Sequence, residues 1–320
     1  MRRTTMMAGL VATVLVAGCS EGNSLRPLGL TNERAGGLRV TTADVYSTVF
    51  SLARLDTISV EASICSATLV APTVLVTAAH CVTIERGDGE YKIQDVDDFY
   101  LENGISVEEL GGDLAVDAIE VHPEYEPGTA FFDIALVYLD QDATPLTGGR
   151  LMRVARSIDE GHVGLARGAN IVGHGGNDYP DFYYDAVDAP EKGARLHVAH
   201  ELSKFGCNAD DPACDYGNLA LSYDNSPEAG FCGSAGGGPV LLFRDAQGDP
   251  AAMPWQYLEA DSPVPPGGSV VLGGVVSRVV EPEDCVGEGI ATRLDSAIGF
   301  LDDVLPEDPA PRRSLPLPWE

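Results

Sequence analysis

Short apolar runs, separated at close intervals by Gly, Pro and Asp, are the feature that most constrains the fold of this chain. Between about Tyr46 and Leu294 they include "SATLVAPTVLVTAAH" (66–80), "IALVYL" (134–139) and "SVVLGGVVSRVV" (269–280). Val, Leu and Ile dominate them, and turn residues follow too soon for alternating helices and parallel strands. The pattern predicts an all-β domain, a barrel or a sandwich, over residues 41–305.

The two ends of the chain differ from this domain. Residues 19–40 are polar and rich in Gly and Arg, which is typical of a tether, and 306–320 are Pro-rich, which predicts a disordered tail. The segment "DSAIGFLDDVL" (295–305) has apolar residues at helical spacing, with Asp295 as a candidate N-cap. We therefore expect one C-terminal helix after the β domain.

The first 18 residues have the features of an export signal. Two arginines precede an apolar run that is too short for a resident membrane helix, and the run ends in Val-Ala-Gly-Cys at 16–19. This segment resembles the bacterial lipoprotein box, in which the signal is cut before a cysteine that is then lipidated. The resemblance implies that lipidated Cys19 anchors an exported protein to the cell envelope, at its periplasmic or outer-membrane face. An ordinary secretory signal with an incidental cysteine is the alternative.

Charge and cysteine content narrow the class of protein further. The formal net charge of −29 repels phosphate backbones, so we expect no nucleic-acid partner. We expect no cofactor and no metal site: the acidic segments 85–98 and 207–214 could offer oxygens to Ca²⁺, but they are more typical of a solvated loop and of a turn closed by a disulfide. Besides Cys19 the chain has six cysteines, an even number that suggests three disulfides in an exported protein but allows 15 pairings. The six are Cys65, Cys81, Cys207, Cys214, Cys232 and Cys285.

Two separate segments carry residues suited to general-base chemistry. His80 follows a strand-like run and precedes Cys81, while Asp133 lies at the mouth of the apolar run that follows it. A buried carboxylate beside an imidazole fixes its tautomer and stabilises the imidazolium. Each signal alone is weak, because a His beside a Cys is more often structural and an Asp before a strand is more often a cap.

Taken together, these segments resemble the trypsin-like (chymotrypsin-family) serine proteases. The family's T-A-A-H-C reads Thr-Ala-Ala-His-Cys at 77–81, and its D-I-A-L reads the same at 133–136, after a family-like His-Pro-x-Tyr at 122–125. "GHG" (173–175) is similar to the family's G-W-G turn, and "GIATRL" (289–294) to G-V-Y-T-R-V. The likeness runs in the family's order over roughly residues 36–305.

The resemblance implies an architecture and a site. It implies two six-stranded antiparallel barrels with the active site in the cleft between them, His80 as base and Asp133 as the residue that orients it. It also implies the pairings Cys65–Cys81 and Cys232–Cys285, which leaves Cys207–Cys214. "VVSRVV" (275–280) resembles the strand that binds substrate backbone, which includes Ser277.

The segment that should hold the nucleophile departs from the family. The pattern C-x-G-D-S-G-G-P, laid without gaps on 232–239, matches only at Cys232 and the final Gly-Gly-Pro. Ser234 takes the place of a glycine, Ala235 that of the aspartate, and Gly236 that of the nucleophilic serine. Glycine has no side chain to attack a carbonyl, so the acyl-enzyme chemistry disappears.

Two further family features are absent. In the family, the aspartate aligned with Ala235 pairs with the N-terminal amine that is freed when the activation sequence R-I-V-G-G is cut. The only counterpart of that sequence here is "ERAGG" (33–37), so both partners of this ion pair are changed. We infer that the domain folds without proteolytic activation. In the family's specificity pocket, the residue at the base aligns with Gly230, which offers no carboxylate for basic substrates. The neighbouring position aligns with Phe231 and a glycine of the pocket wall aligns with Val279, so the resemblance implies a narrowed pocket.

The sequence thus leads to a main expectation and two alternatives. We expect a catalytically inactive trypsin-like homologue that binds a peptide or protein in the cleft and is held to a membrane through Cys19. In the first alternative the chain is an active endopeptidase that uses Ser234 as nucleophile, although two residues of extended chain span roughly 6–7 Å and catalytic hydrogen bonds need about 3 Å. In the second it is a structural surface lipoprotein.

Overall fold

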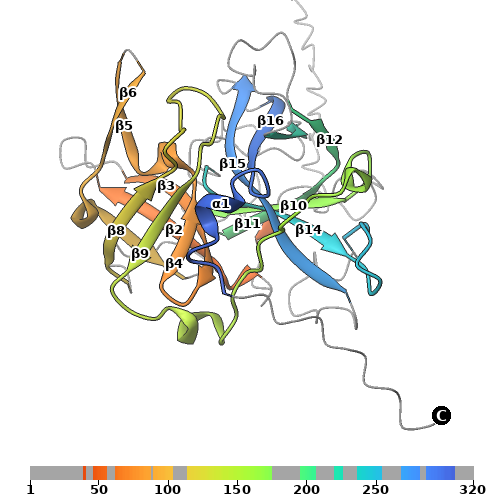
Figure 1. Cartoon of the computed structure of the whole chain (residues 1–320), viewed down its shortest axis with the longest axis horizontal. Helices are drawn as coiled ribbons and strands as arrows, with labels where there is room; N and C mark the ends of the chain where they lie inside the picture. Colours follow the sequence, from red (N-terminus) through yellow and green to blue (C-terminus); the bar gives the residue numbers. More distant parts are fainter. Residues whose placement is uncertain are drawn as a thin grey trace, which may run out of the picture.

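The chain folds into two antiparallel β-barrels that lie side by side (Figure 1). A computed structural model describes residues 39–40, 46–55, 62–87, 89–103, 114–174, 195–206, 220–225, 236–253, 268–281 and 286–306. Within them α-helix is confined to four residues, and β-strands make up both barrels. The expectation of an all-β double barrel is therefore confirmed.

The first barrel is a six-stranded sheet with strand order β7-β2-β3-β4-β9-β8. Its strands are β2 (Val49–Leu55), β3 (Ala62–Ala71), β4 (Val74–Thr77), β7 (Phe99–Glu102), β8 (Val116–Val121) and β9 (Ala135–Leu139). A bridge between Leu101 on β7 and Leu114, just before β8, joins the two edges of the sheet. A hairpin of β5 (Thr83–Gly87) and β6 (Glu90–Ile93) projects from this barrel (Figure 1).

The second sheet has eight strands in the described ranges, where the sequence predicted six. They are β1 (Arg39–Val40), β10 (Ala169–His174), β11 (Arg195–His200), β12 (Leu202–Phe205), β13 (Ala220–Asn225), β14 (Pro239–Arg244), β15 (Ser269–Glu281) and β16 (Val286–Arg293). Only Glu201 separates β11 from β12, yet β11 pairs with β10 while β12 pairs with β13. β11 and β12 therefore act as one bent strand that closes a six-stranded barrel, and β1 adds to its edge.

Hydrophobic side chains fill each barrel and also join the two. The largest cluster holds the buried residues of β2, β3, β4 and β9, and it extends to Val172, Leu241 and Leu272 of the second barrel. A second cluster, around Ile171, Val240 and other inward-facing residues, fills the second barrel. Because one core crosses the junction, the barrels are packed together rather than merely linked.

The C-terminal helix is shorter than the sequence predicted. α1 covers only Ile298–Leu301, and turns flank it on both sides. Asp295 does not cap it, because its carboxylate accepts hydrogen bonds from the Ile158 backbone N–H at 2.9 Å and from the Arg293 guanidinium. Leu301 is fully buried and its neighbours pack on the core of the first barrel, so the apolar face was predicted correctly although the helix length was not.

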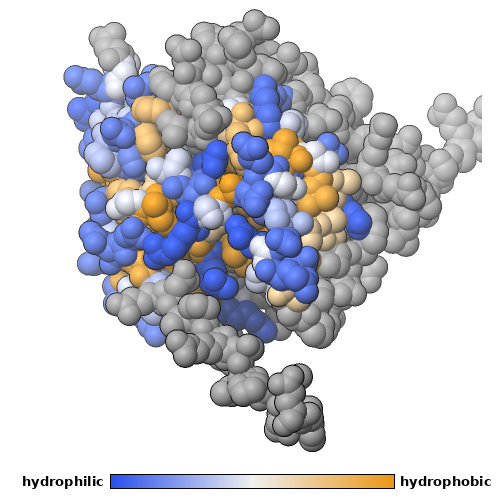
Figure 2. All heavy atoms as spheres, turned by 45° about the vertical axis from the view of Figure 1, so that its right-hand side comes forward, coloured by the Kyte–Doolittle hydropathy of each residue, from blue (hydrophilic) through white to orange (hydrophobic). Residues whose placement is uncertain are grey.

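The visible surface is largely hydrophilic, with smaller hydrophobic areas between the polar ones (Figure 2). Large hydrophobic residues exposed in the described ranges are Ile84, Ile93 and Leu146. The same ranges contain no helix with the length and hydrophobicity needed to cross a bilayer. The signal segment, Cys19, most of the tether and residues 307–320 of the tail lie outside the described residues.

Candidate active site

His80 is held at the end of β4 by a tight corner of backbone. A single 3-10 turn, Ala79–Cys81, follows β4, and the disulfide between Cys65 on β3 and Cys81 fastens this turn to the barrel. The pairing Cys65–Cys81 that the resemblance implied is therefore confirmed. The other four paired-cysteine candidates, Cys207, Cys214, Cys232 and Cys285, lie outside the described residues.

Asp133 meets His80 from the segment that leads into β9. Its Oδ1 accepts the backbone N–H of His80 at 2.9 Å, and its Oδ2 lies 2.7 Å from the His80 Nδ1. Asp133 is 1% exposed, whereas 37% of the His80 side-chain surface is open to solvent. An ionised carboxylate can only accept, so Nδ1 carries the proton and, in the neutral ring, Nε2 carries the lone pair. We call these two residues the His80–Asp133 dyad.

The dyad raises the pKa of His80. Desolvation is the largest single influence and favours the neutral ring, but the negative charge of Asp133 and its hydrogen bond to the ring together outweigh it. The pKa of His80 therefore lies above its usual value of 6.5. A base oriented and tuned in this way can accept a proton from a group placed at Nε2.

Ser277 supplies a contact to the dyad that the sequence did not predict. Its hydroxyl donates to Asp133 Oδ2 at 2.6 Å, and the residue is nearly buried on β15. The resemblance implies for Ser277 only a place in a substrate-binding strand. The available signal was a serine in the valine-rich run 275–280, because a polar side chain on a buried strand needs a polar partner. The hydrogen bond from Ser277 therefore connects the second barrel to the dyad, which belongs to the first barrel.

Strained backbone directs Asp133 toward His80. The residue before it, Phe132, has φ of 44°, a left-handed conformation that costs an aromatic residue roughly 1–2 kcal/mol. Its ring stacks on His122, with centroids 4.1 Å apart, and is nearly buried. No glycine or asparagine marks this position, so the left-handed conformation could not be predicted from the sequence. Packing of Phe132 thus stabilises a backbone turn that points the carboxylate inward.

Gly236, the position aligned with the missing nucleophile, lies next to both halves of the site. Its carbonyl accepts a hydrogen bond from Ser66 N–H at 2.8 Å, and Ser66 follows the disulfide-bonded Cys65. The next residue, Gly237, donates to the carbonyl of Val276 at 2.9 Å, and Val276 precedes Ser277. These hydrogen bonds therefore hold residues 236 and 237 between Ser66, which follows Cys65, and Val276, which precedes Ser277.

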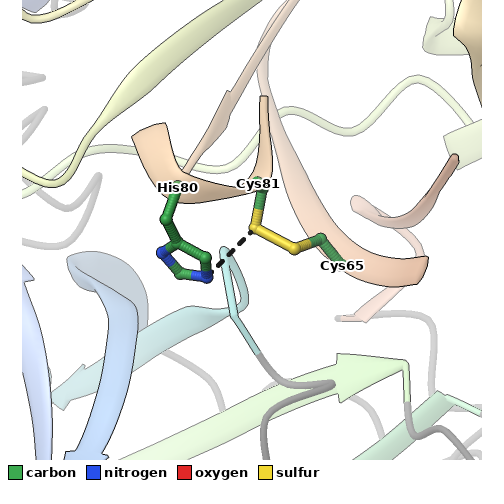
Figure 3. A group of neighbouring side chains, drawn as sticks. All are labelled: Cys65, His80 and Cys81. Carbon is green, nitrogen blue, oxygen red and sulfur yellow. Dashed lines mark hydrogen bonds between the residues drawn. A yellow bond between two sulfur atoms is a disulfide. The ribbon is translucent and has the colours of Figure 1, made fainter. Parts of the chain in front are cut away.

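The remaining predicted site residues divide into two groups. Val279 is partly buried on β15, where it pairs with Gly289 of β16. Gly230, Phe231, Ser234 and Ala235 lie outside the described residues. In the part of the chain that is described, the partner of His80 Nε2 is the Cys81 sulfur, at 3.5 Å, and not a hydroxyl (Figure 3).

Two antiparallel barrels with a His–Asp pair at their junction define the double-barrel class of serine peptidase folds. The family model for Trypsin matches residues 43–181, a range that includes both members of the dyad and ends before Gly236. Residues 43–181 are thus similar to a trypsin-like serine peptidase, and this match supports a homologue of that family. No curated protein matches it.

Proposed function

We propose that this chain is a catalytically inactive trypsin-like homologue that binds an extended peptide or protein segment at the junction of its barrels. The observation that carries the proposal is the location of Gly236. Its carbonyl bonds to Ser66 and its neighbour bonds to Val276, one residue from Cys65 and Ser277 respectively. At the backbone position that the family uses for its serine, this chain has only hydrogen.

Loss of that side chain removes the reaction rather than slowing it slightly. Without an attacking oxygen there is no acyl-enzyme and no proton for His80 to accept from a nucleophile. Removing the nucleophilic serine of a serine protease lowers turnover on the order of 10⁶-fold. Oxyanion donors and substrate binding alone leave rates too low for a useful peptidase.

An edge of β15 beside the dyad, to which the described ranges add no further strand, supports peptide binding. β14 pairs with β15 from Arg244↔Ser269 to Pro239↔Val275, and Gly237 and Gly238 then bond to Val276. From Ser277 to Glu281, the described residues supply partners to β15 only on its β16 side. An extended peptide can add to such an edge through main-chain hydrogen bonds, with side-chain pockets selecting its sequence.

Export and anchoring complete the proposal. The basic start, short apolar run and cysteine of residues 1–19 support a lipid anchor at Cys19, which keeps the barrels at the envelope surface. Metabolic labelling with a fatty-acid analogue should mark the wild type and not Cys19→Ser. Release of unlabelled, unanchored wild-type protein into the medium would contradict the anchor.

A fluorophosphonate probe separates an inactive homologue from an active peptidase. Such a probe reacts covalently with an activated serine, so we expect no label on the wild type. The double variant Gly236→Ser with Ala235→Asp restores the family's two residues and should gain label, and adding His80→Ala should remove that gain. Labelling of the wild type that disappears in Ser234→Ala would refute inactivity.

Binding is tested separately from catalysis. A library of extended peptides should yield ligands whose affinity falls on Val279→Pro, which removes the Val279 backbone N–H and imposes a new backbone angle on this strand. Arg150→Ala, an exposed position outside the strands, is the surface control. Peptide affinities that are unchanged by the strand variant would argue against this edge as the binding surface.

One observation favours an active enzyme as the second candidate. The dyad is intact, and Asp133 raises the pKa of His80 as a general base requires. In that reading Ser234 supplies the nucleophile. The probe experiment with Ser234→Ala decides between the two functions.

A further inference from the structure

Three potential metal ligands meet at the corner that holds His80. The Sγ atoms of Cys65 and Cys81 and a ring nitrogen of His80 all lie within 4.8 Å of one another (Figure 3). In the oxidised chain the two sulfurs form a disulfide and cannot bind an ion as thiolates. We propose that reduction of this disulfide creates a zinc site made of Cys65, Cys81 and His80. It departs from the expectation, drawn from the sequence, of no metal site.

The spacing of the ligand atoms fits tetrahedral zinc. Bond lengths of roughly 2.3 Å to sulfur and 2.0–2.1 Å to nitrogen, at a tetrahedral angle, place the two ligand atoms about 3.5 Å apart. His80 Nε2 and Cys81 Sγ are 3.5 Å apart. Two thiolates on the same ion lie about 3.8 Å apart by the same geometry, close to the contact distance of two unbonded sulfurs.

Little rearrangement of the backbone is required. The Cα atoms of Cys65 and Cys81 are 6.0 Å apart, so small side-chain rotations separate the sulfurs once the bond between them is broken. Both residues are nearly buried, at 8% exposure, on β3 and the 3-10 turn. The ligands would therefore come from elements that the core of the first barrel already holds in place.

Asp133 already provides the outer contact that a zinc-bound histidine needs. Metal-ligating histidines almost always donate their other ring N–H to a carboxylate or carbonyl, which fixes the tautomer and ring orientation. Here Nδ1 donates to Asp133 Oδ2 at 2.7 Å, and Ser277 in turn donates to the same oxygen. Nε2 is thus left as the ligand atom, on the side that faces the sulfurs (Figure 3).

The chemistry balances with an external thiol as reductant. Two thiol molecules transfer two electrons and two protons to the disulfide, which yields the Cys65 and Cys81 thiols and the disulfide of the reductant. Zn²⁺ then displaces both thiol protons and binds two thiolates and the neutral imidazole. With three protein ligands the ion keeps a fourth position for water, as in zinc sites of the catalytic type. The chain's charge of −29 favours the approach of a cation.

Cysteine footprinting on the full chain tests the site. The chain is reduced with a phosphine, mixed with Zn²⁺ or a buffer blank, treated briefly with iodoacetamide and mapped by peptide mass spectrometry. We expect Zn²⁺ to slow alkylation of Cys65 and Cys81 together by at least about tenfold. Asp133→Asn should weaken the zinc affinity by about 10–100-fold, and His80→Ala by more, because it removes a ligand.

Several controls make the result decisive. His80→Gln keeps much of the side-chain volume without an imidazole, so it replaces His80→Ala if the alanine variant does not fold. The cysteines at 207, 214, 232 and 285 serve as internal references, because their protection should not depend on residue 80. Equal protection of Cys65 and Cys81 in the wild type and in the residue-80 variants would overturn the proposal. A lack of protection by Zn²⁺ would also overturn it, and this includes the case in which reduction unfolds the chain. Fluorophosphonate labelling is independent of this readout.

Discussion

Replacement of Gly237 by alanine should destabilise the chain far more than replacement of an ordinary turn glycine. Gly237 has φ of +78°, and a Cβ built on it would lie 2.2 Å from the Ser66 carbonyl oxygen and 2.2 Å from Thr77 Oγ1. Neither atom can move easily. The carbonyl belongs to β3, and the Thr77 hydroxyl donates to that same carbonyl at 2.7 Å. The added Cβ would therefore overlap with two oxygen atoms that are held in place by the hydrogen bond between them.

The magnitude follows from two separate costs. A left-handed conformation costs a residue with a Cβ roughly 1–2 kcal/mol, and overpacking of a filled site costs typically about 1–3 kcal/mol. Gly237→Ala should thus lower the free energy of unfolding by about 2–5 kcal/mol. For a domain of this size that corresponds to a fall in Tm of roughly 4–20 °C.

Gly248→Ala is the matched control for the backbone cost alone. Gly248 has φ of +88°, but no atom lies within 4 Å of its built Cβ. Only the conformational cost of roughly 1–2 kcal/mol should remain. Urea unfolding of both variants, compared through their midpoints at unchanged slope, measures the difference. Equal losses in the two variants would refute the claim that the 236–238 turn is seated against Ser66 and Thr77.

Three further predictions concern the dyad and its supports. An NMR titration should give His80 a pKa above 6.5, and this pKa should fall in Asp133→Asn. The stability that this pair contributes is fully present below pH 6.5 and is lost as the pH rises through the folded-state pKa of His80. A difference in unfolding free energy between the two proteins that does not change with pH would contradict this. Ser277→Ala should cost about 1.5–3 kcal/mol in urea unfolding because a buried carboxylate loses a donor, and a loss below about 0.5 kcal/mol would count against that bond. The double variant Cys65→Ser with Cys81→Ser should lose about 3 kcal/mol, since the bond closes a loop with a separation of 16 residues, and an unchanged midpoint would show that the turn at His80 needs no covalent support.

Local pattern and family motif were enough for the architecture but not for its details. The valine-rich runs between turn residues predicted strands, and the matched segments 77–81 and 133–136 located both halves of the dyad. The length of α1 could not be read in this way. Spacing at 295–305 fits a helix of any length, whereas the partners of Asp295 come from residues 158 and 293, whose positions depend on the tertiary fold. The bend at Glu201, which divides one strand of the second barrel into β11 and β12, was not predicted because nothing in the local composition marks it.

Contacts made by side chains across the junction of the barrels were the least predictable part of the site. The Ser277 bond to Asp133 joins residues 144 apart in sequence, and no local pattern encodes such a pair. The left-handed turn at Phe132 is equally hidden, since aromatic residues rarely adopt it and tertiary packing has to stabilise it. Sequence motifs therefore identified His80 and Asp133, while the residues that position these two side chains could be found only from the fold.

The dyad has a structural role that does not require catalysis. Asp133 accepts a backbone N–H and a ring N–H of His80 from the first barrel and the Ser277 hydroxyl from the second, while Thr292 of β16 donates to its backbone carbonyl at 3.2 Å. Removal of this carboxylate would leave several donors without their partner at a junction that one hydrophobic core crosses, and each buried unpaired group costs about 1–3 kcal/mol. Gly236 makes no comparable demand, because its hydrogen bond with Ser66 uses its backbone carbonyl, which any residue could supply. Under the inactivity that we propose, these hydrogen bonds give a structural reason to retain His80 and Asp133 without a nucleophile.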